Sequence, residues 1–305
     1  MQIHQRWQGL DPKSRGASAA LGNFDGIHLG HQAVINLARN DAALGVVTFE
    51  PHPRQFFAPD NHPFRLMNAE ARANRLAKLG IEQLYELPFD NTLASLTPEA
   101  FARDVLAQGL GLSHVVIGSD FRFGKGRTGT ASDLQDLGLQ YGFRTTIATL
   151  IQIAGQDISS TAIREALTNG NPRDAATMLG HWHRIEGEVI PGEKRGRDLG
   201  YPTANMSIEG LHLPKFGVYA VRVSVLTGPQ QGQYMGAASL GVRPMFGINR
   251  PNLETYLLDF KGDLYGHHLS VALVDYLRPE LKFEDLPALL TQMDADCARA
   301  REILS

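Results

Sequence analysis

The chain has very little cysteine, no long apolar run and no excess of charge of either sign. Only Cys297 among its 305 residues is a cysteine, which excludes an intrachain disulfide framework and favours a reducing compartment. No apolar stretch approaches the length needed to cross a bilayer, and residues 1–10 lack the apolar core of a secretory signal. Lysine and arginine total 29 against 32 acidic residues, so neither nucleic acid nor an acidic membrane is an expected partner. We expect a cytoplasmic protein whose anion sites are local, and the oligomeric state is left open.

The first predicted functional site along the chain lies between residues 22 and 31. An apolar run at 17–21 predicts a buried strand, and apolar residues at helical spacing over 32–43 predict a helix. Between them, Gly26 and Gly30 would let a bulky anion approach the backbone. The first N–H groups of a helix are unpaired and the helix dipole is positive there. The sequence therefore predicts a phosphate site at this turn.

Two histidines in the same stretch are the first candidates for catalysis. His28 and His31 are three residues apart, so both rings can face one side of the first helical turn. Such side chains suit the charge that develops on a phosphorus atom during displacement. The alternatives are a zinc pair or two ordinary capping histidines. Zinc is disfavoured because no cysteine cluster or third histidine lies nearby at ligand spacing, although Asp25 keeps it open.

Residues 23–31 resemble the signature of the HxGH nucleotidyltransferases, which transfer a nucleotidyl group from a nucleoside triphosphate and release pyrophosphate. Along nearly its whole length the chain is most similar to the bacterial bifunctional riboflavin kinase/FAD synthetase family. The resemblance implies an α/β plus β protein, in which a Rossmann-like HxGH nucleotidyltransferase domain precedes a riboflavin kinase β-barrel with a terminal helix. It makes His28 and His31 catalytic. The nucleotide-binding residues that it implies in this stretch are Gly22, Phe24, Asp25, Gly26 and Gly30.

A second apolar run, residues 44–49, predicts another buried strand, followed by Glu50-Pro51-His52-Pro53-Arg54. The two prolines hold polar side chains at the carboxyl end of that strand, where ligands bind in open α/β sheets. A rigid surface turn is the alternative interpretation. In the family this segment borders the nucleotide and flavin site, so the resemblance makes His52 and Pro53 flavin-binding residues.

Helical and strand patterns then alternate as far as a predicted strand at 114–118, which leads into a glycine-rich loop at 119–129. The loop matches the dinucleotide-binding spacing of glycines, but its first glycine is six residues beyond Gly118 and the next predicted strand does not end in an acid. A P-loop is excluded because five residues, not four, separate Gly118 and Gly124. The segment resembles the family's GxDFRFG loop, which implies that Asp120 binds nucleotide and Arg122 binds flavin.

Residues 158–164 open a further predicted helix with hydroxyl residues and an arginine. Hydroxyl donors followed by an arginine can hold a polyphosphate, and simple capping with a solvated arginine is the alternative. In the family this is the second nucleotidyltransferase signature, facing the histidine pair across the sheet, and it implies nucleotide binding by Ser160, Thr161 and Arg164. We predict a domain boundary near Trp182, with a nucleotidyltransferase domain at 1–182 and a riboflavin kinase domain at 183–305.

In the second half the helical patterns give way to strand patterns. Short β-branched or aromatic runs separated by glycine, proline and asparagine predict a compact antiparallel barrel. An amphipathic helix with one apolar stripe is predicted at its end. The predicted strands are 186–190, 217–225, 236–240, 252–260 and 268–276.

A loop at 192–205 combines three cations with several glycines and can fold over a phosphate chain. Thr203 and Asn205 are neutral oxygen donors two residues apart, and magnesium prefers hard oxygens combined with substrate phosphates. A basic surface loop is the alternative. The loop resembles the GxxxGxxLGYPTAN run of riboflavin kinases, which makes Thr203 and Asn205 metal ligands. The nucleotide-binding residues implied by that run are Gly192, Lys194, Gly196, Gly200 and Pro202.

The strand predicted at 252–260 carries an acidic residue. Glu254 alternates in step with Tyr256, Leu258 and Phe260, so we expect its carboxylate on the apolar, inward face of the barrel. A carboxylate there needs a partner or a role. In the family the matching glutamate takes the proton from the terminal ribityl hydroxyl of riboflavin.

The resemblance also makes Arg278 a flavin-binding residue. Met245 and Tyr256 depart from the family, which usually has threonine and histidine at these positions.

The implied function is a bifunctional enzyme of FAD biosynthesis. The barrel would phosphorylate riboflavin with MgATP to FMN, and the N-terminal domain would transfer AMP from a second ATP to FMN, giving FAD and pyrophosphate. Riboflavin, FMN and ATP are the expected partners, and Mg²⁺ the expected cofactor. The alternatives are a nucleotidyltransferase with another acceptor and a flavin-sensing protein that has lost catalysis. The histidine pair and Glu254 argue against a sensor, because binding alone needs no proton acceptor.

Overall fold

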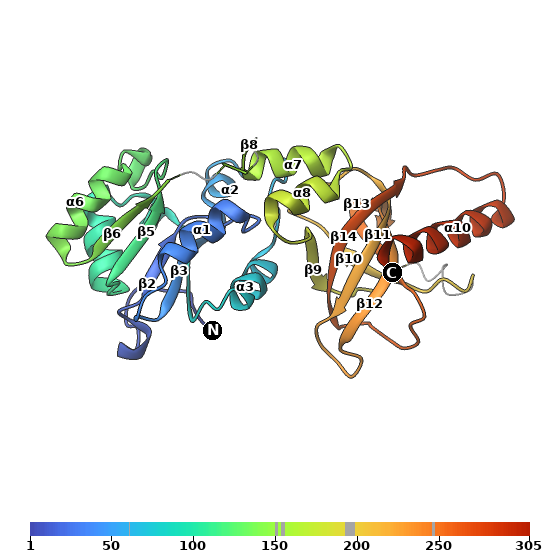
Figure 1. Cartoon of the computed structure of the whole chain (residues 1–305), viewed down its shortest axis with the longest axis horizontal. Helices are drawn as coiled ribbons and strands as arrows, with labels where there is room; N and C mark the ends of the chain where they lie inside the picture. Colours follow the sequence, from blue (N-terminus) through green and yellow to red (C-terminus); the bar gives the residue numbers. More distant parts are fainter. Residues whose placement is uncertain (61, 150–151, 154–155, 193–198, 246–247) are drawn as a thin grey trace. The chain divides into compact units, whose positions relative to one another are not determined.

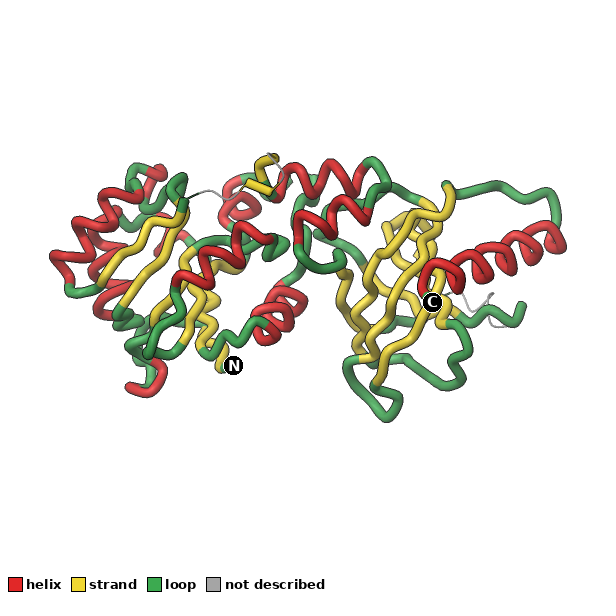
Figure 2. The backbone as a smooth tube through the Cα atoms, viewed as in Figure 1, coloured by secondary structure: helices red, strands yellow, loops and turns green. Residues whose placement is uncertain are grey.

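The computed structural model describes residues 1–60, 62–149, 152–153, 156–192, 199–245 and 248–305. Its contacts divide the chain into two compact units, which Figure 1 traces in sequence colours and Figure 2 by secondary structure. The first unit comprises Met1–Asn61 and Arg72–Ile158, and the second comprises His62–Ala71 and Ser159–Ser305. No helix among the described residues is long and apolar enough to cross a membrane. The boundary near Trp182 stays a prediction.

The first unit is built on a six-stranded parallel sheet with the strand order β1-β4-β3-β2-β5-β6. The run Leu44–Phe49 of β3 is buried throughout, as a parallel sheet covered on both faces requires. The strands are β1 Gln2–His4, β2 Ser18–Leu21, β3 Leu44–Glu50, β4 Gln83–Pro88, β5 His114–Gly118 and β6 Arg144–Ala148.

Helices cover both faces of this sheet. Val105 and Leu134, from η2 and α6, belong to one core cluster with Ile117 of β5. Helix α1 contacts β2, β5 and β6, and its buried Ile35 lies outside that cluster. The remaining elements are η1 Pro12–Ser14, α1 Leu29–Leu37, α2 Pro53–Phe57, α3 Ala69–Lys78, α4 Asn91–Ala94, α5 Pro98–Ala100, the π-helix η2 Phe101–Gly109, η3 Lys125–Arg127, α6 Ala131–Tyr141, and the short strands β7 Gln152–Ile153 and β8 Gln156–Asp157.

The second unit contains a six-stranded antiparallel sheet in the order β10-β13-β12-β11-β14-β9. An isolated bridge between Ile190 and Asn205 joins its two edges, so the sheet is nearly closed. The predicted barrel with a terminal helix is therefore confirmed. The elements are α7 Ser160–Thr168, α8 Pro172–Leu179, β9 Arg184–Glu188, β10 Thr203–Ser207, β11 Gly217–Val225, β12 Gly232–Met245, β13 Ile248–Leu257, β14 His268–Arg278 and α10 Leu286–Leu304.

Both faces of the barrel wall are covered. Leu253 and Leu257 of β13 belong to the cluster that fills the interior. On the outer face, Ala237 of β12 packs with Ala300 and Leu304 of α10. The predicted inward position of Glu254 is therefore wrong, because Glu254 alternates with these leucines and lies on the outer face. Strand β13 ends at Leu257, so Leu258 and Phe260 do not continue its alternation.

The segment His62–Ala71 belongs to the second unit although it comes early in the sequence. Leu66 is buried with Ile163, Leu167 and Leu179 of α7 and α8. The Asn68 side chain donates a hydrogen bond of 2.8 Å to the carbonyl oxygen of Glu186 in β9. This segment therefore completes a small core beside the barrel.

Candidate active sites

The strand order of the first unit identifies the edge at which a ligand is expected. Strand β2 pairs with β3 on one side and with β5 on the other, so the chain changes direction across the sheet at β2. Ligands of open α/β sheets bind at such a switch point, beyond the carboxyl ends of the strands. The segments that leave β2, β3 and β5 at this edge contain the predicted histidine pair, His52 and Asp120.

The turn between β2 and α1 holds its backbone in an uncommon conformation. Phe24 and Ile27 have φ values of 51° and 46°, and Gly26 between them has φ of 88°. Left-handed φ is rare for residues with a side chain, and rarest for β-branched ones such as isoleucine. Both side chains are buried, which holds them in place. Strain that surrounding structure enforces is commonly found at functional sites.

His28 and His31 are stacked at the start of α1. The helix begins at Leu29, earlier than predicted, with His28 as its N-cap. The backbone N–H of His31 donates to Nδ1 of His28 at 3.3 Å, and the two rings are 3.6 Å apart between centroids. Since Nδ1 accepts, a neutral His28 carries its proton on Nε2. A Cβ at Gly30 would lie 3.1 Å from Nδ1 of His28, so glycine there leaves the ring its space.

The second histidine of the pair is held in a neutral form. Burial, and secondly the neighbouring His28, lower the pKa of His31 well below 6.5. Its Nδ1 atom is buried and makes no hydrogen bond with any described residue. Phe24 packs edge-on against the ring at 5.3 Å between centroids. At neutral pH His31 thus carries little positive charge.

The other residues predicted in this unit occupy the same edge. His52 caps α2 by accepting from the backbone N–H of Arg54 at 3.0 Å, and Pro53 is the first residue of that helix. Asp120 and Arg122 are exposed after β5. A Cβ at Gly118 would lie 3.0 Å from Oδ1 of Asp120. The alternative of a rigid turn at His52 and the binding roles of all four remain predictions.

Sequence reasoning missed an ion cluster below this edge. Arg72, which is buried, donates to Glu50 at 2.7 Å and to Glu86 at 2.6 Å. Glu50 directly precedes the turn with His52 and Pro53, so the arginine fixes the strand end from which that turn starts. Glu86, an acidic residue between Tyr85 and Leu87 of β4, was the signal for such a partner.

Ser160, Thr161 and Arg164 belong to α7 in the second unit. Ser159 caps this helix through the N–H of Ala162. The Arg164 guanidinium lies 5.4 Å from the ring centroid of Phe64 and donates to the carbonyl oxygen of the same residue. Arg164 is therefore held by the segment His62–Ala71.

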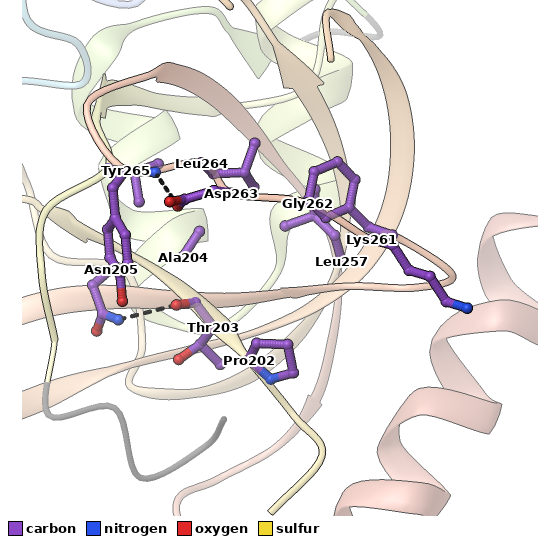
Figure 3. A pocket seen from close by; sticks show the side chains of 12 residues that line it. Pro202, Thr203, Ala204, Asn205, Leu257, Lys261, Gly262, Asp263, Leu264 and Tyr265 are labelled. Carbon is purple, nitrogen blue, oxygen red and sulfur yellow. Dashed lines mark hydrogen bonds between the residues drawn. The ribbon is translucent and has the colours of Figure 1, made fainter. Parts of the chain in front are cut away.

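The barrel contains a pocket of about 240 Å³ beside the start of β10. Three predicted residues, Pro202, Thr203 and Asn205, line it. Figure 3 shows the Asn205 amide directed at the carbonyl oxygen of Thr203, a hydrogen bond of 3.3 Å, and Lys261 extending away from both. The other lining residues are Val189, Ala204, Leu257, Phe260, Lys261, Gly262, Asp263, Leu264 and Tyr265.

The turn after β13 supplies much of this pocket and was not predicted as part of a site. Lys261 and Asp263 are exposed, and Oδ1 of Asp263 accepts from the backbone N–H of Tyr265 at 3.0 Å. The signal was a cluster of glycine, aspartate and lysine directly after a strand that carries Glu254.

The remaining residues of the basic loop differ in how the structure describes them. A Cβ at Gly192 would overlap the Asn205 amide, so only glycine fits beside that side chain. Gly200 has a φ of 85°, a conformation that glycine adopts without strain. Lys194 and Gly196 lie outside the described residues.

One register row crosses the barrel wall and joins three of the predicted residues. Asn205 of β10 pairs with Glu254 of β13, and Glu254 pairs with Ser239 of β12. Ser239 pairs with Val218, and Val218 pairs with Arg278 of β14. Cross-strand partners share a face, so all five lie on the outer face of the barrel wall. Three strand spacings separate Glu254 from Arg278, about 14 Å along the sheet.

Arg278 is anchored at the end of this row. It forms an ion pair of 2.7 Å with Asp296 of α10, and both side chains are largely buried. Tyr201, just before β10, donates to Asp294 of the same helix. Helix α10 thus holds both ends of the row. Tyr256 packs against Tyr201 at 5.1 Å between ring centroids, and the side chain of Met245 is not described.

Comparison with known proteins finds two families along the chain. Residues 10–162 match the family model for FAD synthetase, and residues 179–304 match the one for riboflavin kinase. The chain is 40% identical over 310 residues to the bifunctional riboflavin kinase/FMN adenylyltransferase of Pseudomonas fluorescens, covering 99% of this chain and 98% of that protein. The Escherichia coli (strain K12) protein of the same name is 38% identical over 292 residues, covering 94% and 92%.

A solved structure resembles the chain over its length. The crystal structure of a Streptococcus pneumoniae protein described as a macrolide-efflux protein has a TM-score of 0.81 and 31% identity, covering 98% of both chains.

Proposed function

Since this chain belongs to the family of bifunctional riboflavin kinases and FMN adenylyltransferases, we propose that it makes FMN and FAD at two separate sites. The riboflavin kinase half phosphorylates riboflavin with ATP to FMN. The FAD synthetase half adenylylates FMN with a second ATP, giving FAD and pyrophosphate. Efflux, the activity named for the S. pneumoniae protein, is not proposed, because both family models name flavin enzymes.

The adenylylation site is the carboxyl edge of the first unit's sheet. A phosphate oxygen of FMN attacks the α-phosphorus of ATP and pyrophosphate leaves. This nucleophile needs no base, because a phosphate monoester is already largely ionised at neutral pH. His28 Nε2–H, His31 and the N-terminal N–H groups of α1 stabilise the charge on the α-phosphate of the adenylyl group that is transferred. Gly22, Phe24, Asp25, Gly26, Gly30 and Asp120 surround the nucleotide, and His52, Pro53 and Arg122 the flavin. For Ser160, Thr161 and Arg164, which belong to the second unit, we propose nucleotide binding as well.

The kinase site lies along the row from Asn205 to Arg278. A hydroxyl nucleophile, unlike a phosphate, needs a base, and Glu254 takes its proton. The observation that supports this assignment best is the pairing of Glu254 with Asn205, which lines the pocket. ATP occupies that pocket next to Pro202, with Gly192, Lys194, Gly196 and Gly200 over its phosphates. The flavin lies on the side of Arg278.

Magnesium would be held by Thr203 and Asn205 together with substrate phosphates. The donor set fits this ion, because both side chains carry neutral hard oxygens and lie two residues apart on one face of β10. The ion would neutralise phosphate charge during transfer.

We propose residues 1–182 and 183–305 as the two domains, and the cytoplasm, where ATP is available, as the compartment. The lone Cys297 agrees with a reducing environment.

Two substitutions, one in each proposed site, test the two-site proposal. The protein is incubated with riboflavin and MgATP, or with FMN and MgATP, and FMN and FAD are separated by chromatography. Glu254→Gln should slow FMN formation by about a hundredfold to ten-thousandfold and leave FAD formation from supplied FMN intact. His31→Ala should do the opposite. If either substitution removed both activities in a chain with an unchanged circular dichroism spectrum, the two-site proposal would be wrong.

A further inference from the structure

A buried asparagine lies beside the row of kinase residues and has no role in the proposed mechanism. Asn252 is 2% exposed and lies two residues before Glu254 on the same face of β13. Its register partners are Ser207 and Gly241, so neither neighbouring strand contributes a bulky side chain beside it. A Cβ at Gly241 would overlap the carboxylate of Glu280.

The Asn252 side chain reaches both of the residues to which the kinase chemistry is assigned. Its Nδ2 atom donates to Oε1 of Glu254 at 3.3 Å and to Oδ1 of Asn205 at 3.5 Å. Both acceptors are oxygens, which fixes the amide with its NH₂ group toward them. One donor group therefore spans β13 and β10 and holds the base and the metal ligand at a set separation.

Packing alone does not account for an asparagine at this position. Its Oδ1 atom is buried and has no hydrogen-bond partner among the described residues. Leaving a buried acceptor unpaired costs stability, and an apolar side chain of the same shape would avoid that cost. Leucine has the same branched arrangement of heavy atoms.

We propose that Asn252 is a positioning residue of the kinase reaction, which orients Glu254 and Asn205 toward the flavin hydroxyl and the magnesium–phosphate complex. The inference rests on the roles proposed above for those two residues. Groups that orient a catalytic residue or a metal ligand are worth about tenfold to hundredfold in activity. Asn252 acts through its neighbours and touches no substrate.

The test uses the full chain and steady-state kinase kinetics at varied Mg²⁺. Asn252→Leu should lower kcat by about tenfold to hundredfold and raise the Mg²⁺ concentration for half-maximal rate, while the KM for ATP changes little. Its melting temperature should stay equal or rise. Asn252→Asp keeps the size but turns a negative oxygen toward Glu254, so kcat should fall at least as far. FAD formation from supplied FMN should be unchanged in both variants.

Thr255→Val is the matched control. Thr255 is the buried residue next to Glu254 on the opposite face, and its Oγ1 atom is also unpaired. This variant should gain stability and keep its kcat. A melting temperature of Asn252→Leu that fell in parallel with kcat would establish a structural role and overturn the inference.

A double-mutant cycle separates this inference from the proposed function on which it rests. In a Glu254→Gln background, Asn252→Leu should lower kcat by less than about threefold, because the base that it orients is already absent. Fully additive losses would overturn the positioning role while leaving Glu254 as the base. Full activity of Glu254→Gln alone would instead overturn the proposed function, and the inference with it.

Discussion

His28 combines an observed capping role with a proposed catalytic one, and substitution can separate them. Asparagine can replace the histidine as acceptor for the N–H of His31, whereas alanine cannot. We expect both His28→Asn and His28→Ala to lose at least about a hundredfold in FAD formation from FMN. Only His28→Ala should also lose about 1 kcal/mol of stability. Chromatography and urea unfolding measure the two effects. Equal stability of the variants would show that the cap contributes nothing.

A buried histidine should make the second unit sensitive to acid. His183 is 4% exposed, and burial, then His181 and His212, lower its pKa to about 3. In the unfolded chain its pKa is near 6.5, so between these values the unfolded state binds the extra proton. Stability should be complete above about pH 7 and fall as the pH drops below 6.5. From pH 7.5 to 5 the loss is about 2 kcal/mol.

His183→Gln should flatten this slope. Urea midpoints measured at several pH values by Trp182 fluorescence in a Trp7→Phe background would show it. His62→Gln, at an exposed position, is the control. An unchanged slope in His183→Gln would assign the acid sensitivity to other groups.

The sequence predicted the strands that have a clear local pattern and missed a short polar strand that depends on its partners. Strands such as His114–Gly118 and Gly217–Val225 match their predicted bounds, because continuous apolar or alternating patterns determine them. Strand β10 was missed because Ala204 and Asn205 give it little strand propensity. Its pairing with β13 on one side and its bridge to Ile190 on the other create it, and no local pattern contains that information.

The candidate sites divide in the same way. The turn with His28 and His31 was predictable because its glycines, cap and helix are local. The face of Glu254 was not, because Tyr256 shares that face and packs there against Tyr201, so the outer face of β13 also carries an aromatic side chain. The contact of Asn252 with Asn205 joins residues 47 positions apart, so only the fold brings them together.

The segment His62–Ala71 should contribute to the stability of the second unit. Leu66 is fully buried against α7 and α8, so Leu66→Ala should cost about 2–5 kcal/mol there. Trp182 fluorescence in a Trp7→Phe background should report the loss, and Trp7 fluorescence in a Trp182→Phe background should not. Leu84→Ala in β4 should give the reverse pattern. Loss of both signals in either variant would show that the units unfold together.

Across the whole molecule, each half carries its own core and its own tryptophan. Trp7 packs against the cluster of the first unit, and Trp182 packs against the cluster under α10. Since these are the only two tryptophans in the sequence, each single-tryptophan variant follows one unit. In each single-tryptophan variant, the unfolding of one unit can therefore be compared with the loss of the activity proposed for that unit.

The alkylation rate of the single cysteine reports on the exposure of α10. Cys297 of α10 packs against the barrel wall, and burial, then the carboxylates of Asp296 and Asp294, raise its pKa to about 11. Ionisation alone should make alkylation of the folded chain roughly 100-fold slower than that of the unfolded chain at neutral pH. The rate of iodoacetamide labelling, followed by mass spectrometry, would then measure how frequently α10 detaches from the barrel wall. Helix α10 also anchors Arg278, at the proposed flavin end of the row from Asn205 to Arg278. Bound riboflavin should therefore slow the labelling. The dependence of the labelling rate on riboflavin concentration would measure flavin affinity without turnover.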